Sequence, residues 1–361
     1  MVTLRAGFDL RPAAIDPDRG LGRVAAGLAR ALASMGGLEL TVFVPSGVHV
    51  EGWYTAGVEV VHLPQPRRGA WLWDGPAWRW VLRRHPVDVL HLPAWGVPPG
   101  IPVPVVATLH DVTPVRHPEA IPVGRVRRRA VQRLGTYRRA TLVHAVSRAT
   151  ARDAVHVLGI PPERVRVVAN GVTPPASPAR GPREHVLFVG GADPHKRVDL
   201  LVEAWTLNRA PDLPPLVVAG GAAGHPAVRR GAALRPGVVR PLGTVEDGEL
   251  HALYARAVAV LLPSLWEGFG LPALEGQAHG AVPVLTARSA LPEAGGEAAL
   301  YVPAGAPARR WAEAVLRLVR DPVLAGRLRE AGFARARRST WGGTAARLAG
   351  VYREAAMRAS S

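Results

Sequence analysis

The chain of 361 residues has no cysteine and, among its many basic residues, only one lysine. The absence of cysteine excludes disulfides, thiolate metal sites and cysteine nucleophiles, and it fits a reducing compartment. No apolar run approaches the ~20 residues that a membrane-spanning helix needs, and residues 1–10 lack the apolar centre of a secretory signal. We therefore expect a cytoplasmic protein.

The lone lysine is Lys196; the other 44 members of the Lys+Arg total of 45 are arginines. It lies in residues 187–199, LFVGGADPHKRVD, a pattern that predicts a strand, a glycine turn and the start of a helix. A compact ammonium suits a diphosphate as a point charge, whereas guanidinium prefers planar, bidentate partners. We predict a phosphate contact at Lys196; the alternative is a surface lysine without a special role.

The formal net charge of +17 would ordinarily suggest nucleic acid as a partner. Arginine is spread along the chain, however, and no zinc-finger or aromatic RNA-binding signature accompanies it, so we expect no nucleic-acid partner. The exception is one predicted helix that is crowded with arginines: Arg125, Arg127, Arg128, Arg129, Arg133, Arg138 and Arg139. Such a helix could lie on anionic lipid headgroups at the inner membrane face, or it could be a solvated helix face.

The length predicts two domains of ordinary size, and alternating helical and Val/Leu-rich segments predict parallel α/β sheets. Strands are predicted at 3–8, 40–44, 58–63, 87–92, 103–108, 141–145 and 164–168, and then at 186–189, 216–219, 238–241, 257–262 and 282–285. A proline-, serine- and glycine-rich linker at 173–182 separates the two sets. We predict doubly wound domains at 1–180 and 181–336 that face each other across a ligand-binding cleft.

Residues 263–276, PSLWEGFGLPALEG, place two carboxylates around a glycine-punctuated turn that opens a helix. Gly268 and Gly270 permit positive φ and close approach, and Pro272 suits the first helical position. Backbone N–H groups at the helix start could receive phosphate or sugar oxygens, while Glu267 and Glu275 accept hydrogen bonds from hydroxyls. This pattern predicts a nucleotide-sugar pocket.

His110 and Gly22 are two further candidate contacts in the predicted first domain. His110 comes at the end of strand 103–108, where imidazole could bind a sugar hydroxyl or move a proton, although a histidine there is often structural. Gly22, in the sequence GLG at 20–22, precedes a helical pattern. We interpret Gly22 as a phosphate or acceptor contact, with a plain turn as the alternative.

Metal and aromatic signals are weaker. Asp16 and Asp18 superficially resemble the paired aspartates of a metal-dependent sugar transferase, but no apolar strand directly precedes them, so we predict no metal.

Five tryptophans gather in one region: Trp53, Trp71, Trp73, Trp78 and Trp80. Trp71 with Trp78, and Trp73 with Trp80, are spaced two helical turns apart, which favours burial under a helix; the alternative is an acceptor or membrane-edge surface.

With these motifs placed, nearly the whole chain resembles the family-4 retaining glycosyltransferases of the GT-B fold. The family's Glu, seven residues, Glu signature is met by Glu267 and Glu275, its donor-phosphate lysine by Lys196 and its first-domain histidine by His110. The tail 337–361 is similar to the family's closing helix, which crosses back onto the first domain. The resemblance implies two Rossmann-like domains, an acceptor domain followed by a nucleotide-sugar domain.

The resemblance also implies residue roles. Glu267 would contact the donor sugar near its reacting carbon, Glu275 would hold the ribose hydroxyls, and Val245 would lie against the nucleobase. The remaining donor contacts would come from the same loop, at Gly268, Phe269, Gly270 and Leu271. Gly191 departs from the family, because many members carry an arginine there that joins the lysine on the diphosphate; Arg197 is the candidate replacement.

For the reaction, the resemblance implies retention of the anomeric configuration without a metal or other cofactor, with the leaving phosphate accepting the proton of the attacking hydroxyl. Residues 289–302 resemble the subgroup that includes bacterial mannosyltransferases of surface polysaccharide assembly, so GDP-mannose is the favoured donor and a saccharide or lipid-linked saccharide the acceptor. UDP-glucose and UDP-N-acetylglucosamine stay open as donors. A non-catalytic nucleotide-sugar-binding protein is the rival of another class.

Overall fold

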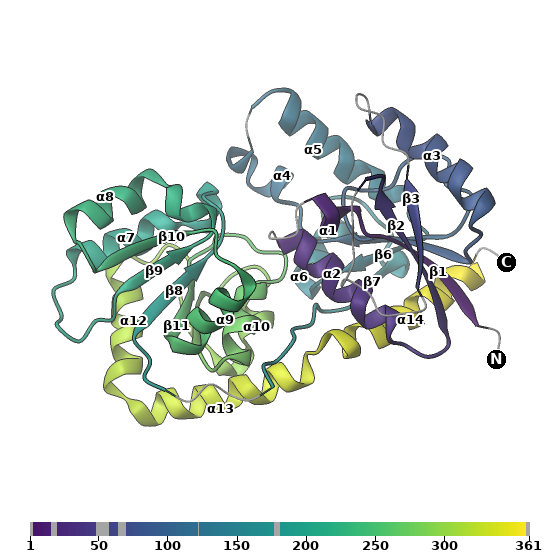
Figure 1. The fold of residues 1–361 in the computed structure, drawn as a ribbon. Helices are drawn as coiled ribbons and strands as arrows, with labels where there is room; N and C mark the ends of the chain where they lie inside the picture. Colours follow the sequence, from purple (N-terminus) through teal and green to yellow (C-terminus); the bar gives the residue numbers. More distant parts are fainter. Residues whose placement is uncertain are drawn as a thin grey trace. The chain divides into compact units, whose positions relative to one another are not determined.

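A computed structural model describes residues 3–15, 20–47, 58–63, 70–121, 123–176 and 181–358, without the side chains of 70–74. Contacts divide the chain into two compact units (Figure 1). The first comprises Met1–Arg116, Pro122–Gly171 and Trp341–Ser361, and the second His117–Ile121 and Val172–Thr340. The division therefore falls at Gly171, before the predicted boundary at 180, which itself lies outside the described residues.

The first unit contains a seven-stranded parallel sheet in the order β3-β2-β1-β4-β5-β6-β7. Its strands are β1 (Leu4–Asp9), β2 (Leu38–Pro45), β3 (Glu59–Leu63), β4 (Val89–Leu92), β5 (Val105–Leu109), β6 (Leu142–Ala145) and β7 (Val165–Val167). All seven predicted strands are confirmed, with ends shifted by up to two residues. The order reverses direction at β1 and β4, as in a doubly wound fold.

Helices cover both faces of this sheet: α1 (Arg11–Ile15), α2 (Gly20–Ala33), α3 (Ala70–Arg84), α4 (Thr113–Arg116), α5 (Arg125–Gly135), α6 (Arg148–His156) and α14 (Trp341–Arg358). On one face α3, α5 and α6 bury Trp78, Leu134 and Ala154 in a common core. The other face is covered by α2 and α14, where Gly27 leaves room for the indole of Trp341; a Cβ on Gly27 would lie 2.5 Å from that ring. Substitution of Gly27 would therefore separate α2 from α14.

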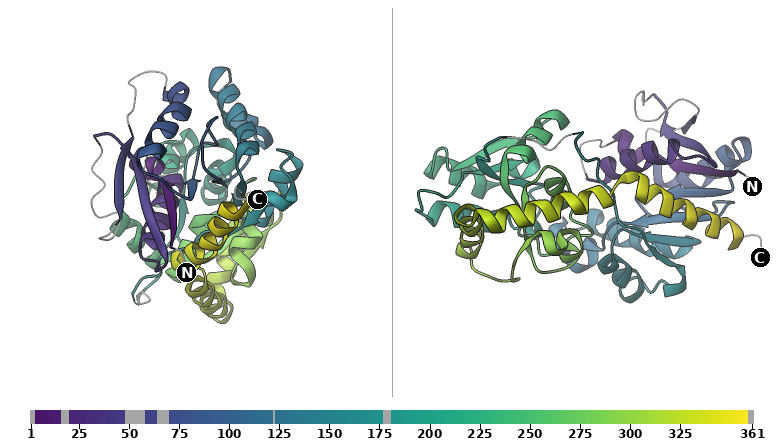
Figure 2. Two further views of the ribbon diagram at one scale, coloured as in Figure 1. Left: turned by 90° about the vertical axis from the view of Figure 1, so that its right-hand side faces the viewer. Right: turned by 90° about the horizontal axis from the view of Figure 1, so that it is seen from below.

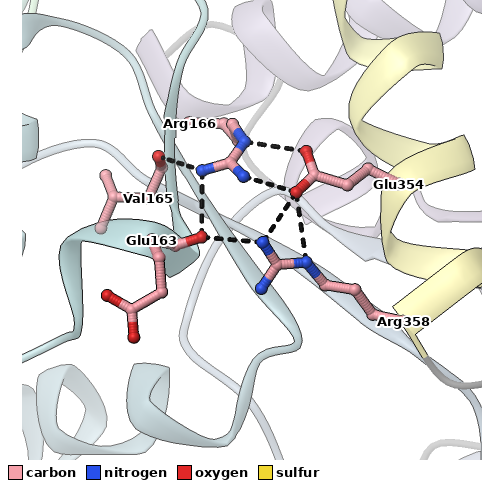
Figure 3. A network of polar contacts seen from close by, with 5 residues as sticks. All are labelled: Glu163, Val165, Arg166, Glu354 and Arg358. Carbon is pink, nitrogen blue, oxygen red and sulfur yellow. Dashed lines mark hydrogen bonds and ion pairs between the residues drawn. The ribbon is translucent and has the colours of Figure 1, made fainter. Parts of the chain in front are cut away.

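Helix α14, the last helix of the chain, packs along the first unit, beside α2, β4 and β5 (Figure 2). Glu354 accepts hydrogen bonds from Arg166 on β7, including Nε to Oε2 at 2.8 Å, and Arg358 reaches the same carboxylate (Figure 3). Both arginines also donate to the carbonyl of Glu163, at 3.1 and 3.0 Å. Two cations around one carboxylate hold the pKa of Glu354 below its usual range.

A buried network of hydrogen bonds connects α14 to the sheet. His144 Nε2 lies 2.7 Å from the carbonyl of Val168, which can only accept, so this nitrogen carries the proton and Nδ1 accepts from the Thr108 hydroxyl at 2.9 Å. Thr108 in turn accepts from His91 Nε2 at 2.7 Å, and His91 Nδ1 accepts from the hydroxyl of Tyr352 at 2.6 Å. Every side chain of this network has a hydrogen-bond partner while both imidazoles are neutral.

The second unit contains a six-stranded parallel sheet in the order β10-β9-β8-β11-β12-β13. Its strands are β8 (His185–Val189), β9 (Leu216–Ala219), β10 (Val239–Gly243), β11 (Ala257–Leu262), β12 (Val282–Thr286) and β13 (Leu300–Val302). Five of these were predicted. The sequence prediction missed β13, because a three-residue edge strand is too short to show a periodic pattern.

Helices again form two layers: α7 (Val198–Leu207), α8 (Pro226–Leu234), α9 (Asp247–Arg256), α10 (Leu271–Ala278), α11 (Leu291–Gly295), α12 (Arg309–Arg320) and α13 (Pro322–Arg338). One core contains Trp205 of α7 and Trp311 of α12; the other contains Tyr254 of α9 and Ala273 of α10. Neighbouring strand residues alternate between the two cores, as buried parallel strands require. Within the described ranges, no helix combines the length and the apolar character that a membrane crossing needs.

Candidate active site

Lys196 lies in the connection from β8 to α7 and points at Glu267. A short 3₁₀ turn, Pro194–Lys196, follows the glycine turn after β8, and α7 begins two residues later. Lys196 Nζ donates to Glu267 Oε1 at 2.6 Å, and the two side chains are 24% and 12% exposed. The structure thus brings together Lys196, the predicted phosphate contact, and Glu267, the residue expected near the reacting carbon of the sugar, and it leaves both within reach of solvent. With His110, these are the residues for which the sequence suggests a catalytic role.

Two serines hold Glu267 in place. The Ser264 hydroxyl donates to the same Oε1 at 2.7 Å. The Ser289 hydroxyl donates to the Glu267 carbonyl at 2.6 Å and accepts from the Glu267 N–H at 3.2 Å, with Ser289 itself at φ +57°. Sequence reasoning missed the role of both serines. Ser264 could have been found as a hydroxyl within the glycine loop, whereas Ser289 is distant in sequence and nothing local links it to Glu267.

The glycine loop reaches α10 through a left-handed residue. Gly270 has φ +90°, and a Cβ there would lie 2.8 Å from Leu291, so the turn requires glycine on both counts. The neighbouring Gly268 and Leu271 are half-buried, and Phe269 packs against a small core cluster that contains Leu274. Because α10 begins at Leu271, not at Pro272 as predicted, Glu275 is the fifth helical residue and lies just beyond the first turn.

A backbone hydrogen bond joins this loop to the lysine turn: Leu265 N donates to the His195 carbonyl at 2.8 Å. Glu275, on α10, accepts at Oε2 from the hydroxyl of Tyr254, also at 2.8 Å. Lys196, Glu267 and the glycine turn therefore belong to the connections that follow β8 and β11, and Glu275 lies on the helix that the second connection opens. Ligands of open α/β sheets bind outside the carboxyl ends of such strands.

Three other residues of this unit were predicted to contact the nucleotide-sugar donor: Gly191, Arg197 and Val245. A Cβ on Gly191 would lie 2.6 Å from Asp193 Oδ2, so a larger residue there would displace that carboxylate. Arg197 adopts a left-handed conformation at φ +53°, its Nε lies 3.7 Å from Asp199 Oδ1, and it lines a cavity of about 90 Å³ beside Leu265. Val245 is half-buried against the core under α9.

His110 and Gly22 belong to the first unit. His110 follows β5, and its Nε2–H donates to the Pro93 carbonyl at 2.7 Å, which leaves Nδ1 as the nitrogen with a lone pair. Burial lowers the pKa of His110, so the ring is neutral near pH 7 and can accept a hydrogen bond. Gly22 is buried within the first turn of α2, Gly20–Ala33, rather than before the helix as the sequence pattern suggested.

Several residues that the sequence analysis named lie outside the described residues. Asp16, Asp18 and Trp53 lie outside them, as do the side chains of Trp71 and Trp73. Of the tryptophans that remain, Trp78 is buried as expected, whereas Trp80 is half exposed, with the Arg84 guanidinium 4.0 Å from its ring centre. Within the described ranges, no group of three or more His, Asp or Glu residues is placed to hold a metal ion.

Two parallel sheets of Rossmann order, one carrying a lysine and paired acids at its strand ends, define the GT-B class of glycosyltransferase fold. Solved structures agree. Sucrose-phosphate synthase from Thermosynechococcus elongatus has a TM-score of 0.75 at 20% identity, over 99% of this chain and 100% of that one. Anabaena HepE, in complex with UDP and glucose, has a TM-score of 0.72 at 16% identity, over 97% and 100%.

Sequence comparison gives the family. Residues 183–321 match the family described as Glycosyl transferases group 1, and residues 19–174 match Glycosyltransferase Family 4. The D-inositol 3-phosphate glycosyltransferase of Acidothermus cellulolyticus is 33% identical over 318 residues, which is 78% of this chain and 68% of that protein. O-antigen chain mannosyltransferase B of Escherichia coli is 29% identical over 268 residues, 67% of this chain and 66% of that protein. The chain belongs to the group 1, family-4 glycosyltransferases, and the matches span about two thirds of these relatives' own length.

Proposed function

We propose that the protein is a retaining, metal-independent hexosyltransferase that moves mannose from GDP-mannose onto a saccharide or lipid-linked saccharide in polysaccharide or glycoconjugate synthesis. The observation that carries this proposal is the 2.6 Å contact between Lys196 and Glu267 at the glycine loop. A cation held beside a carboxylate at a strand end can meet a diphosphate and a sugar at the same time.

In the proposed reaction, the bond between the sugar's anomeric carbon and the diphosphate breaks while the acceptor oxygen forms a new bond to that carbon. The acceptor's proton passes to the departing diphosphate. Lys196 stabilises the charge that develops on the leaving group, and Glu267 lies near the reacting carbon, held by Ser264. His110, neutral and anchored through Nε2, offers Nδ1 to a sugar hydroxyl.

The remaining donor contacts are assigned to the loop and its surroundings. Backbone groups at Gly268, Phe269, Gly270 and Leu271 meet sugar and phosphate, Glu275 holds the ribose, and Val245 lies against the base. Arg197 supplies the second diphosphate cation that Gly191 lacks, with Lys196 beside it in sequence. Gly22 contributes a phosphate or acceptor contact from the first unit.

The mannosyl donor is favoured because residues 289–302 resemble mannosyltransferases and because a relative is named as a mannosyltransferase. The alternatives are UDP-glucose and UDP-N-acetylglucosamine, since a structural neighbour was solved with UDP-glucose. A non-catalytic nucleotide-sugar-binding protein is less favoured, because such a protein has no need to keep the lysine and both glutamates together.

A thermal-shift screen of GDP, UDP, ADP and TDP, followed by their sugars, tests the proposed donor. Ligand at 100 times its Kd stabilises a native protein by about 2.7 kcal/mol, so one nucleotide should raise the melting temperature by several degrees. We expect GDP and GDP-mannose to give the largest shifts, with free guanosine as the matched control. Equal shifts for all diphosphates and for guanosine would contradict nucleotide recognition, and a preference for UDP would replace the mannosyl assignment.

We propose further that α5 docks on anionic lipid, which would bring the enzyme to a lipid-linked acceptor. Its five arginines have no acidic partner within ion-pair distance among the residues that the structure describes, and residues 123–139 contain no acid at all. Leu134 is buried in the core, while Val126 and Val131 are 57% and 40% exposed on the flanks of the arginine face. A cationic face bordered by valines suits a headgroup layer.

Vesicle co-sedimentation tests this docking. The protein should pellet with vesicles that contain phosphatidylserine and stay in the supernatant with neutral vesicles, and added salt should release it. Changing Arg125, Arg128 and Arg129 to serine should weaken binding about tenfold or more, whereas the same change at Arg309, Arg310 and Arg317 on α12 removes equal charge and should matter little. Binding without dependence on anionic lipid would exclude the proposal.

A further inference from the structure

The carboxylate of Glu275 is held by a buried phenol. Tyr254, on α9, is 1% exposed, and its hydroxyl donates to Glu275 Oε2 at 2.8 Å. Hydrogen bonds to an ionised acceptor are short and strong, and a buried tyrosine ring has no other rotamer available without repacking the core. The direction in which Glu275 points is therefore set from α9, a helix that lies outside the glycine loop.

The backbone of Glu275 is held at the same place. His279, which follows α10, lies with Nδ1 2.8 Å from the Glu275 carbonyl, and its ring stacks on Tyr254 at 5.6 Å between centroids. Since a carbonyl can only accept, Nδ1 carries the proton, and Nε2 accepts from Nδ1 of His251 at 2.8 Å. Burial lowers the pKa of His279, which keeps this ring neutral and the arrangement intact near pH 7.

Helix α9 also reaches the segment assigned to the base. Val245 precedes α9 and packs against the core that contains Tyr254. The helix follows at once, since Leu250 N donates to the carbonyl of Glu246, the residue next to Val245, at 2.9 Å. Helix α9 thus begins two residues after Val245, the proposed base contact, and it carries near its end the phenol that bonds Glu275. Sites built on helices hold such geometry more closely than loops do.

We infer that Tyr254 is a positioning residue for nucleoside recognition: it fixes Glu275 in the orientation that accepts hydrogen bonds from a ribose diol. The inference rests on the proposed function, in which Glu275 holds the ribose. It predicts that discrimination between ribose and deoxyribose depends on a hydroxyl that does not itself touch the nucleotide.

Tyr254→Phe removes the one oxygen and keeps the ring packing. Calorimetry would compare the nucleoside diphosphate that binds most tightly with its 2′,3′-dideoxy analogue. The wild type should prefer the ribose form about tenfold or more, as expected for hydrogen bonds to a charged group. Tyr254→Phe should reduce this ratio at least threefold by weakening the ribose form alone. Tyr301→Phe, which loses a hydroxyl bonded to Gly296 in the same unit, should leave the ratio unchanged.

The ratio compares two ligands on the same protein, so a partly unfolded variant still reports it. If Tyr254→Phe weakens both ligands equally, the residue is merely structural and the inference is overturned. On a Glu275→Gln background, Tyr254→Phe should have no further effect on the ratio; an undiminished effect would also overturn it. If the wild type binds both ligands equally, the ribose assignment of the proposed function fails instead, which is a distinguishable result.

Discussion

Replacing Lys196 by alanine is expected to reduce turnover by about 10²–10³-fold, because in the proposed reaction its ammonium is the preorganised charge that meets the leaving diphosphate. The change also leaves Glu267 without its 2.6 Å partner. Initial-rate measurements with the donor identified by the thermal-shift screen would show the loss. Because the side chain is partly exposed, the fold should survive, and circular dichroism should match the wild type.

Glu267→Ala should reduce turnover to a comparable extent. The double variant should lose far less than the product of the two single losses, since the two side chains are hydrogen-bonded and act as a unit in the proposed reaction. Arg256→Ala is a suitable control, because Arg256 forms an exposed ion pair with Glu184 in the same unit. Wild-type turnover in either Lys196→Ala or Glu267→Ala would refute the assignment of the site.

Mild acid is expected to destabilise the first unit through its buried histidines. Burial lowers the pKa of His144 from 6.5 to about 4 and that of His91 well below its usual value. Below pH 6.5 the unfolded chain binds protons that the folded protein excludes, so stability falls as the pH falls from 6.5 towards 4. For His144 alone the shift corresponds to about 3 kcal/mol.

The structural reason is the direction of the hydrogen bonds. Protonation turns Nδ1 of both rings into donors, so His144 can no longer accept from Thr108, nor His91 from Tyr352 on α14. Urea midpoints at pH 7, 6 and 5 would measure the effect. His144→Gln should flatten the decline with acid, whereas His156→Gln, at an exposed site on α6, should leave it as steep as in the wild type. An equal decline in all three proteins would contradict the explanation.

Much of the fold could be predicted from the sequence, because buried parallel strands are short apolar runs between helical patterns. The run 257–262 coincides with β11, and the prediction at 216–219 coincides with β9. The missed strand β13 is three residues long, and its place in the sheet depends on pairing with β12, a contact distant in sequence.

The site was predictable where its chemistry is local. Glu267, Gly270 and Glu275 lie within nine consecutive residues, from the glycine loop into α10, and the lone lysine stood out by composition. The side chains that hold those groups were not predictable: Tyr254 and Ser289 reach the two glutamates from other elements, and nothing in the sequence links either residue to a glutamate. Supporting residues are found only when distant segments are seen packed together.

The central claim is that Lys196, Glu267 and Glu275 together bind an activated sugar, and a crystal structure with a bound nucleoside diphosphate tests it most directly. The account predicts a phosphate oxygen within hydrogen-bond distance of Lys196 Nζ and the ribose hydroxyls on Glu275. A nucleotide whose phosphates lie away from Lys196, with neither glutamate in contact, would contradict it.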